Sequence, residues 1–371
     1  MKKILMLILI VFLLTNCVAN KTRSDILKET NDEQKVSFVA VGDNLIHKGL
    51  IDNAYHQGKY DFSSYYENIK PYIEKYDLSF INQETILGGE EWGYSGYPLF
   101  NTPDEMAETL VKTGFDIING SNNHALDMGE AGVDHAIEVF SKYKDIKYIG
   151  LKQTQIPVIH KNGIKIAFLA YNQSLNGNII SSSVQFFDKE KIEKEIEEAK
   201  KISDCIIVSC HWGNEYDDSP DDFQREYAQF FADMGVDVII GSHSHTLQSV
   251  EWIEGKSGHK TLVAYSLGNF LSGMMEEDTQ LGGMLSFDIE KNSNGIMIDH
   301  VLLTPLINHY QVQDKSNRMN TRYNFQVFRL KDYTETLASQ HGLNGYKGIE
   351  ISIDKMKNRV KERISGINVD M

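Results

Sequence analysis

The stretch FDIINGSNNHALDMG, residues 115–129, joins an apolar run to a dense cluster of polar side chains. A short apolar run bounded by turn residues is typical of a buried strand. Asparagine, aspartate and glycine are ordinary turn residues and need no function to explain them. His124 is not a turn residue of this kind. Its meaning therefore depends on whether other strands end in matching groups.

Strand-like and helix-like segments alternate on both sides of this stretch. Buried strands are predicted at residues 35–43, 78–85, 115–119, 204–213 and 236–245. Amphipathic helices are predicted at residues 104–114, 131–143, 188–201 and 225–235. The alternation favours an α/β fold with largely parallel strands, and consecutive strands at 260–270, 282–290 and 295–305 suggest a second sheet in the same domain.

Length and charge limit the classes of function. The chain has 371 residues, of which 41% are hydrophobic, and its formal net charge is −15. A large core is therefore possible, but nucleic acid is not expected as a partner, because phosphate backbones recruit basic surfaces. A bound metal could still reverse the sign of the charge locally.

The N-terminus has the pattern of a processing signal. Residues 1–17 combine two lysines, an apolar run too short to span a bilayer, and Cys17. They resemble a bacterial lipoprotein signal in which Cys17 becomes lipidated, although Asn16 stands where a smaller residue is usual. A plain secretory signal and an uncleaved anchor are the alternatives. Residues 18–35 are expected to be a polar tether, which places the protein at the extracytoplasmic face of the cell membrane.

Five predicted strands end in groups that bind metals or transfer protons. They deliver Asp43, Glu84 (with Asn82 before it), Asn122, Asn123, His124, Asp127, His211, Glu215, His243 and His245. Each is weak evidence alone, since a Gly-Asp pair is usually a turn and a single histidine is more often structural. Ligands bind beyond the carboxyl ends of parallel strands, so these groups are expected at one edge.

Taken together, these groups predict a metal site. Mixed oxygen and nitrogen donors without thiolates favour Zn²⁺, Mn²⁺ or Fe. The donors outnumber what one tetrahedral ion requires, and two divalent ions sharing a bridging carboxylate would use them. Such two-metal sites activate water and stabilise a leaving oxygen.

The motifs VGDNLIHKG, NQET, NGSNNHALDMGEAG, CHWGNEY, GSHSHTLQ and YSLGNF occur in order between Val36 and Leu303. This set resembles the CapA family of poly-γ-glutamate capsule synthesis proteins, within the metallophosphoesterase superfamily. The resemblance implies a four-layer αββα sandwich of the calcineurin-like type with a dimetal site. By motif matching, the metal ligands would be Asp43, Glu84, Asn123, His211, His243 and His245. His124 would be the catalytic proton donor or oxyanion stabiliser.

The chain departs from the family patterns at several positions. Leu45 stands where phosphoesterases have a histidine, so the resemblance leaves one metal a ligand short. His47 lies nearby, but the sequence alone does not show that it replaces the missing histidine. Gln83 and Ser244 replace a usual leucine and proline without removing a donor. Asp127 and Glu215 are expected to orient ligands, or else to be caps or surface groups. Ser266 and Asn269 contact substrate or form a turn beneath the site.

Three functions remain open at this point. The first is a lipid-anchored CapA-like protein with a metal-dependent hydrolase site. It would act in synthesis, export or trimming of an anionic capsule polymer, together with the synthase complex of that polymer. The second is a secreted phosphoesterase, for which a basic clamp is missing near the motifs, Arg225 being the nearest candidate. The third is a non-catalytic assembly factor. Residues 36–308 are assigned to the CapA-like domain and residues 309–371 to a C-terminal extension of unknown role.

Overall fold

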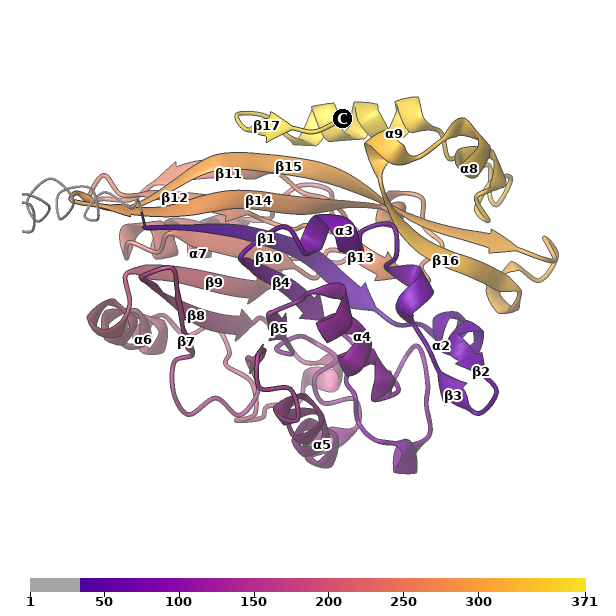
Figure 1. The fold of residues 1–371 in the computed structure, drawn as a ribbon, viewed down its shortest axis with the longest axis horizontal. Helices are drawn as coiled ribbons and strands as arrows, with labels where there is room; N and C mark the ends of the chain where they lie inside the picture. The colour runs from indigo at the N-terminus through magenta and orange to yellow at the C-terminus, as the bar shows by residue number, and fades with distance from the viewer. Residues whose placement is uncertain (1–33) are drawn as a thin grey trace, which may run out of the picture.

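Two β-sheets pack face to face in the structure, a computed structural model that describes residues 34–371 (Figure 1). The larger sheet has the strand order β16-β15-β14-β1-β4-β5-β6, with β13 paired to β1 and β17 paired to β15. Its strands are β1 (Gln34–Leu45), β4 (Leu78–Gln83), β5 (Ile117–Asn119), β6 (Lys147–Ile149), β13 (Asn269–Ser272), β14 (Leu281–Asn292), β15 (Gly295–Val312), β16 (Arg322–Arg329) and β17 (Asn368–Val369).

The second sheet has six strands in the order β11-β12-β10-β9-β8-β7. These are β7 (Val158–Lys161), β8 (Ile164–Asn172), β9 (Cys205–His211), β10 (Val238–Ser242), β11 (Val250–Glu254) and β12 (Lys260–Ala264). A separate small hairpin joins β2 (Tyr55–His56) to β3 (Lys59–Tyr60). In both large sheets the central strands run parallel, as the α/β alternation predicts.

Helices cover the outer faces of the sandwich. The helices are α2 (Lys48–Ala54), α3 (Lys70–Ile73), α4 (Glu105–Thr113), α5 (Gly129–Ser141), α6 (Lys189–Ile202), α7 (Asp222–Asp233), α8 (Glu335–Gln340) and α9 (Ile353–Arg363). Buried side chains of α6 and α7 pack on one face of the second sheet. Its other face meets the larger sheet, where Phe38 stacks on Phe168 with ring centroids 6.2 Å apart. Because α4 and α5 pack on the larger sheet, the four-layer αββα arrangement is confirmed.

Local sequence signals explain several element boundaries. Helix α4 ends at Gly114, which takes the left-handed conformation (φ 103°) that favours glycine. Helix α7 begins with a capping box between Asp221 and Gln224, a few residues before the expected start. The turn between β7 and β8 is Asn162-Gly163, both at positive φ, as a tight hairpin requires.

Two predictions about strand organisation were wrong. Of the three late segments predicted to form a second sheet, only the first contributes to it, through β12; β14 instead pairs with β1, and β15 and β16 follow as antiparallel neighbours in the larger sheet. The second sheet is instead built from β7 to β12. The assigned tether is also two residues too long, because Gln34 and Lys35 already pair with Lys291 and Glu290 in the sheet.

The boundary predicted at residues 308 and 309 falls inside β15, so the C-terminal extension is part of the same domain. Strand β16 pairs with β15, and α9 buries Met356 and Val360 in the main core. Figure 1 shows α8, α9 and β17 lying alongside the late strands. The extension looks polar in sequence because α9 exposes one face to solvent while burying only a few apolar positions.

The predicted signal, Cys17 and most of the predicted tether lie outside the described residues. Within residues 34–371, no helix is long and apolar enough to cross a membrane.

Candidate metal centre

Strands from both sheets bring their carboxyl ends to one place. Asp43 lies near the end of β1 and Glu84 directly follows β4, both in the larger sheet. His211 is the last residue of β9, and His243 follows β10, both in the second sheet. The expected single edge is therefore a junction between the edges of two packed sheets.

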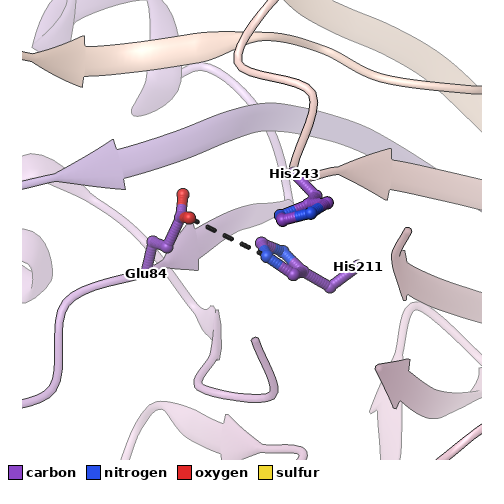
Figure 2. Close-up of side chains that lie close together, drawn as sticks. All are labelled: Glu84, His211 and His243. Atoms are coloured by element: carbon purple, nitrogen blue, oxygen red, sulfur yellow. Dashed lines mark ion pairs between the residues drawn. The ribbon is translucent and has the colours of Figure 1, made fainter. Parts of the chain in front are cut away.

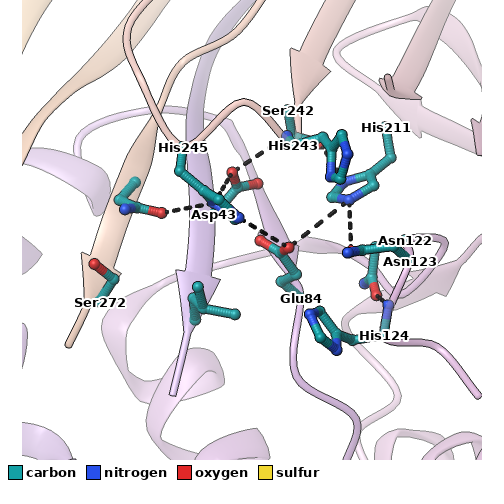
Figure 3. Close-up of polar contacts among 12 residues, drawn as sticks. Asp43, Glu84, Asn122, Asn123, His124, His211, Ser242, His243, His245 and Ser272 are labelled. Carbon is teal, nitrogen blue, oxygen red and sulfur yellow. Dashed lines mark hydrogen bonds and ion pairs between the residues drawn. The ribbon is translucent and has the colours of Figure 1, made fainter. Parts of the chain in front are cut away.

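Two groups of three ligand-type side chains form there and share Glu84. In the first group, the ligand atoms of Glu84, His211 and His243 all lie within 4.8 Å of one another (Figure 2). In the second, Asp43, Glu84 and His245 meet the same limit. Glu84 Oε1 is 3.8 Å from His211 Nε2 and 3.7 Å from His245 Nε2. One carboxylate therefore lies between two sets of donors, as a bridging ligand would (Figure 3).

The polar atoms of this cluster fit a cation. Within the described residues, neither carboxylate oxygen of Glu84 has a hydrogen-bond partner, and His243 Nδ1 has none either, although all three atoms are buried. Buried polar atoms are nearly always paired, and leaving one unpaired costs about 1–3 kcal/mol. A divalent ion would satisfy all three atoms.

Asn123 reaches the same cluster from the loop after β5. Its Oδ1 lies 2.9 Å from His211 Nε2. The amide oxygen and the ring nitrogen are thus close enough to serve as two ligands of one ion. Serine 242 fixes the other side of the ring, with its Oγ 2.9 Å from His211 Nδ1.

Electrostatics in the metal-free cluster are strongly perturbed. Burial, together with the charge of Asp43, raises the pKa of Glu84 well above its usual value. Burial lowers the pKa of His243 to about 3 and that of His211 well below its usual value. Burial also opposes protonation of His245, but Glu84 and Asp43 outweigh it and raise the pKa of His245 to about 9. Neutral His211 and His243 can donate a nitrogen lone pair to a metal.

The backbone at the histidine pair is strained. His243 and His245 have φ values of 99° and 60°, in the left-handed region that non-glycine residues seldom adopt. Strain of this kind is kept where the surroundings over-determine the conformation, commonly at functional sites. The pair is held by Asp43, whose Oδ2 accepts from the His243 backbone N–H and lies 3.3 Å from His245 Nδ1.

Neighbouring amides hold the carboxylate and imidazole groups in place. Asn82 donates to Asp43 Oδ1 over 2.7 Å, and Asn269 Oδ1 lies 3.1 Å from His245 Nδ1. Asn122 shapes the loop, since its side chain accepts from the His124 backbone N–H and donates to the Gln83 carbonyl.

His124 lies beside the cluster and is oriented by a carboxylate. Its Nδ1 is 2.7 Å from Asp127 Oδ2, and both side chains are buried. Because a carboxylate only accepts, Nδ1 carries the proton, and Nε2 is left as the nitrogen that can exchange one. Phe100 packs edge-on against the ring with centroids 4.6 Å apart, and its backbone N–H donates to the same Asp127 oxygen.

Some candidate residues lie away from the ligand atoms. Glu215 is exposed, and its charge only adds to the rise in the pKa of Glu84. Ser266 forms part of a turn, accepting from the Gly268 N–H. Leu45 is buried, and His47 belongs to neither ligand group, so His47 does not replace the missing histidine.

Asn176 is a neighbour of the site that sequence reasoning missed. Its amide nitrogen lies 3.1 Å from His124 Nδ1 and 3.4 Å from Nε2, and its Oδ1 accepts from Asn123. Asn176 follows β8, which ends beside β9. If β8 had been recognised from the sequence as a strand of the second sheet, the polar residues after its end, including Asn176, would have been predicted as site residues.

Comparison with known families agrees with the motifs. A family described as "Bacterial capsule synthesis protein PGA_cap" matches residues 37–274. The chain belongs to this family. Both ligand groups and the loop that carries His124 lie within the matched segment.

Two curated relatives carry the same capsule assignment. The PGA biosynthesis protein CapA of Bacillus subtilis (strain 168) is 32% identical over 203 residues, which is 52% of this chain and 52% of the relative. The capsule biosynthesis protein CapA of Bacillus anthracis is 25% identical over 283 residues, 72% of this chain and 67% of the relative. The matched region thus spans about half the length of the first relative and two thirds of the second.

Among solved structures, a protein assigned as a 5′-nucleotidase from Staphylococcus aureus aligns with a TM-score of 0.48 and 14% identity, covering 77% of this chain and 57% of its own. A 5′-nucleotidase from Candida albicans aligns with a TM-score of 0.40 and 16% identity, covering 67% and 46%. Likeness at this level decides nothing about the chemistry of this chain.

Proposed function

We propose that this protein is a metal-dependent hydrolase that acts on an anionic capsule polymer, poly-γ-glutamate, during its synthesis, export or trimming. The observation that carries the proposal is the pair of ligand groups sharing the unpaired Glu84 carboxylate. Membership of a capsule synthesis family supports the choice of a capsule polymer as the substrate.

The ligands would be Asp43, Glu84, Asn123, His211, His243 and His245. When bound, two divalent ions (Zn²⁺, Mn²⁺ or Fe) would activate water and stabilise the negative charge that develops on the substrate oxygen. Glu84 is the residue that the two ligand groups share. Asn82 and Asn269 would keep the Asp43 and His245 side chains oriented through their hydrogen bonds.

His124 would move the proton. Asp127 holds the proton at Nδ1 and stabilises the positive charge when Nε2 is also protonated. A protonated Nε2 can donate to the leaving nitrogen of an amide, or to the leaving oxygen of an ester, as that bond breaks. Two hydrogen bonds hold the His124 loop: the His124 backbone N–H donates to Asn122, and the Phe100 backbone N–H donates to Asp127.

The proposed location is the extracytoplasmic face of the cell membrane, with Cys17 as the lipid anchor. The polymer and its synthase complex are the proposed partners, and the net charge of −15 counts against nucleic acid. An anchored enzyme would meet the polymer where it leaves the cell.

A second function, non-catalytic capsule assembly, is favoured by one observation. Leu45 occupies the position at which phosphoesterases have a histidine, and His47 does not reach the ligand groups. One metal position thus has fewer ligands than the resemblance implies. In this alternative the cluster would serve structure or polymer binding.

Metal content of the purified full chain tests the proposal. Elemental analysis is expected to find about two transition-metal ions per chain, and fewer in a His243→Ala, His245→Ala variant. His160→Ala is the matched control, because His160 is exposed on β7 away from the cluster. His124→Ala should keep its metal but lose hydrolysis of a γ-glutamyl polymer. A parent protein that binds no ion after reconstitution with Mn²⁺ or Zn²⁺ would exclude the hydrolase mechanism.

A further inference from the structure

A cavity of about 580 Å³ lies near the metal cluster, although no candidate ligand lines it. Tyr216 lines the cavity, and its ring centroid is 6.3 Å from that of His245. His47 also lines it and packs edge-on against Phe100, which in turn packs against His124. One layer of side chains therefore separates the cavity from the ligand groups, and two rings separate it from the proposed proton donor.

Much of the cavity wall comes from the C-terminal part of the chain. Met319, Arg322, Tyr346 and Lys347 face residues of α2 and the segment after β13. The family match ends at residue 274, so this wall is built by residues outside the matched segment. A role for residues 309–371 can thus be sought at the site itself.

Arg322 is a buried cation without a counterion. The residue is 7% exposed, and no carboxylate of the described chain lies within ion-pair distance of its guanidinium. Its Nε donates to the Met319 carbonyl and its Nη1 to the Gly273 carbonyl, while no hydrogen bond found within residues 34–371 uses Nη2. The Tyr310 ring centroid lies 5.7 Å from the guanidinium carbon. These contacts are all neutral and leave the positive charge without a carboxylate to balance it, so the guanidinium is suited to receive an anion.

Lys347 adds a second free cation to the same wall. It is exposed, stands at φ 49°, and is without an acidic partner among the residues that the structure places. The remaining charges on the wall are Lys48, which pairs with Asp52, and Glu276. Two unpaired cations beside one free carboxylate give the cavity a positive balance in a chain whose net charge is −15.

We propose that this cavity binds an oxyanion-bearing segment of the substrate, through Arg322 and Lys347, and so holds the neighbouring bond against the metal cluster. That the bound anion belongs to the substrate rests on the proposed function. The anion site itself rests only on the cavity and on its two cations without a carboxylate partner. Carboxylate and phosphate share the required chemistry, and a repeating anionic chain such as a γ-linked glutamate oligomer is the ligand expected here.

Calorimetric titration of the full chain at low salt tests the site without using activity. The probes are a γ-linked glutamate oligomer and, in a separate arm, inorganic pyrophosphate. The variants are Arg322→Gln and Lys347→Gln, with Lys201→Gln on the outer helix α6 as a control that removes the same charge elsewhere. If replacing the buried Arg322 prevents folding, the Lys347→Gln variant still tests the anion site.

We expect the oligomer to bind, and each cavity variant to weaken it about tenfold, while Lys201→Gln changes little. Binding should persist in the His243→Ala, His245→Ala variant, which separates this site from the metal proposal. Binding of pyrophosphate alone would keep the anion site but assign it to a phosphate-bearing chain. The inference is overturned if neither probe binds, or if Lys347→Gln binds as the parent does.

Discussion

Glu84→Gln should have opposite effects on the metal-free and the metal-loaded protein. Glu84 is fully buried, and neither of its oxygens has a hydrogen-bond partner within the described residues. Glutamine keeps the shape and removes the charge that burial disfavours. We expect the free energy of unfolding of the metal-free variant to rise by about 1–3 kcal/mol, because a neutral amide is less costly to bury than a carboxyl group whose ionised form burial disfavours.

Asp43→Asn is the matched control, since it also removes one buried carboxylate from the cluster. Asp43 accepts from Asn82 and from the His243 N–H, and it lies 3.3 Å from the His245 ring nitrogen. Asparagine keeps one acceptor oxygen but replaces the other with an NH2 donor, so part of this set is left unsatisfied and the metal-free protein should be destabilised by about 1–3 kcal/mol. The two substitutions thus differ in sign without metal.

Urea unfolding followed by fluorescence of the buried Trp212 measures both effects. Saturating Mn²⁺ or Zn²⁺ at 100 times the dissociation constant should stabilise the parent by about 2.7 kcal/mol and both variants much less. The reasoning fails if Glu84→Gln lowers stability without metal, or if the ion still stabilises that variant as it does the parent.

The same carboxyl group gives a pH dependence of known sign. Because the folded pKa of Glu84 is raised above its usual value of 4.5, the unfolded chain releases this proton first. Its contribution to the stability of the metal-free protein is therefore lost as pH rises from about 4.5 toward the raised value. Glu84→Gln should flatten that part of the stability profile relative to the parent.

Three other substitutions test the remaining parts of the structure. Asp127→Asn removes the charge 2.7 Å from His124 and should lower hydrolysis by about 10²–10⁴-fold with metal content unchanged, which turnover and elemental analysis together would check. Phe38→Ala opens the interface between the sheets, where its ring stacks on Phe168, and should cost about 3–5 kcal/mol of unfolding free energy in urea. Met356→Ala should cost about 2–5 kcal/mol in the same assay if α9 belongs to the domain core, and a surface appendage would show almost no change.

Much of the fold was predictable because apolar periodicity reports burial directly. The strands β1, β4 and β9, which carry or precede Asp43, Glu84 and His211, are rich in buried apolar residues, and Gly114 marks the end of its helix by its left-handed conformation. Pairing partners were not predictable in the same way. The sequence of β14 alone does not indicate that it pairs with β1 and not with a strand close in sequence, because pairing between distant strands depends on the whole packed core.

The ligand residues were found because their chemistry is unusual at strand ends, but their arrangement required the structure. Sequence order does not reveal that Glu84 lies between two ligand groups, nor that Asp127 contacts His124 while Glu215 faces solvent. No sequence signal pointed to the cavity residue Arg322, because its significance depends on the lack of an ion-pair partner among residues 34–371, which only the packed structure reveals.

The position of β1 in the larger sheet has a consequence for the order of folding. Strand β1 has one neighbour close in sequence, β4, but Val36 pairs with Ile289 and Asp43 pairs with Asn269, so its other neighbours lie more than 200 residues along the chain. Contacts this distant in sequence slow folding and leave early intermediates with open strand edges. A nascent chain therefore cannot close its central sheet until β14 has been synthesised. Asp43 joins the histidines only then, so the cluster is completed late, and chains truncated before β14 should aggregate rather than bind metal.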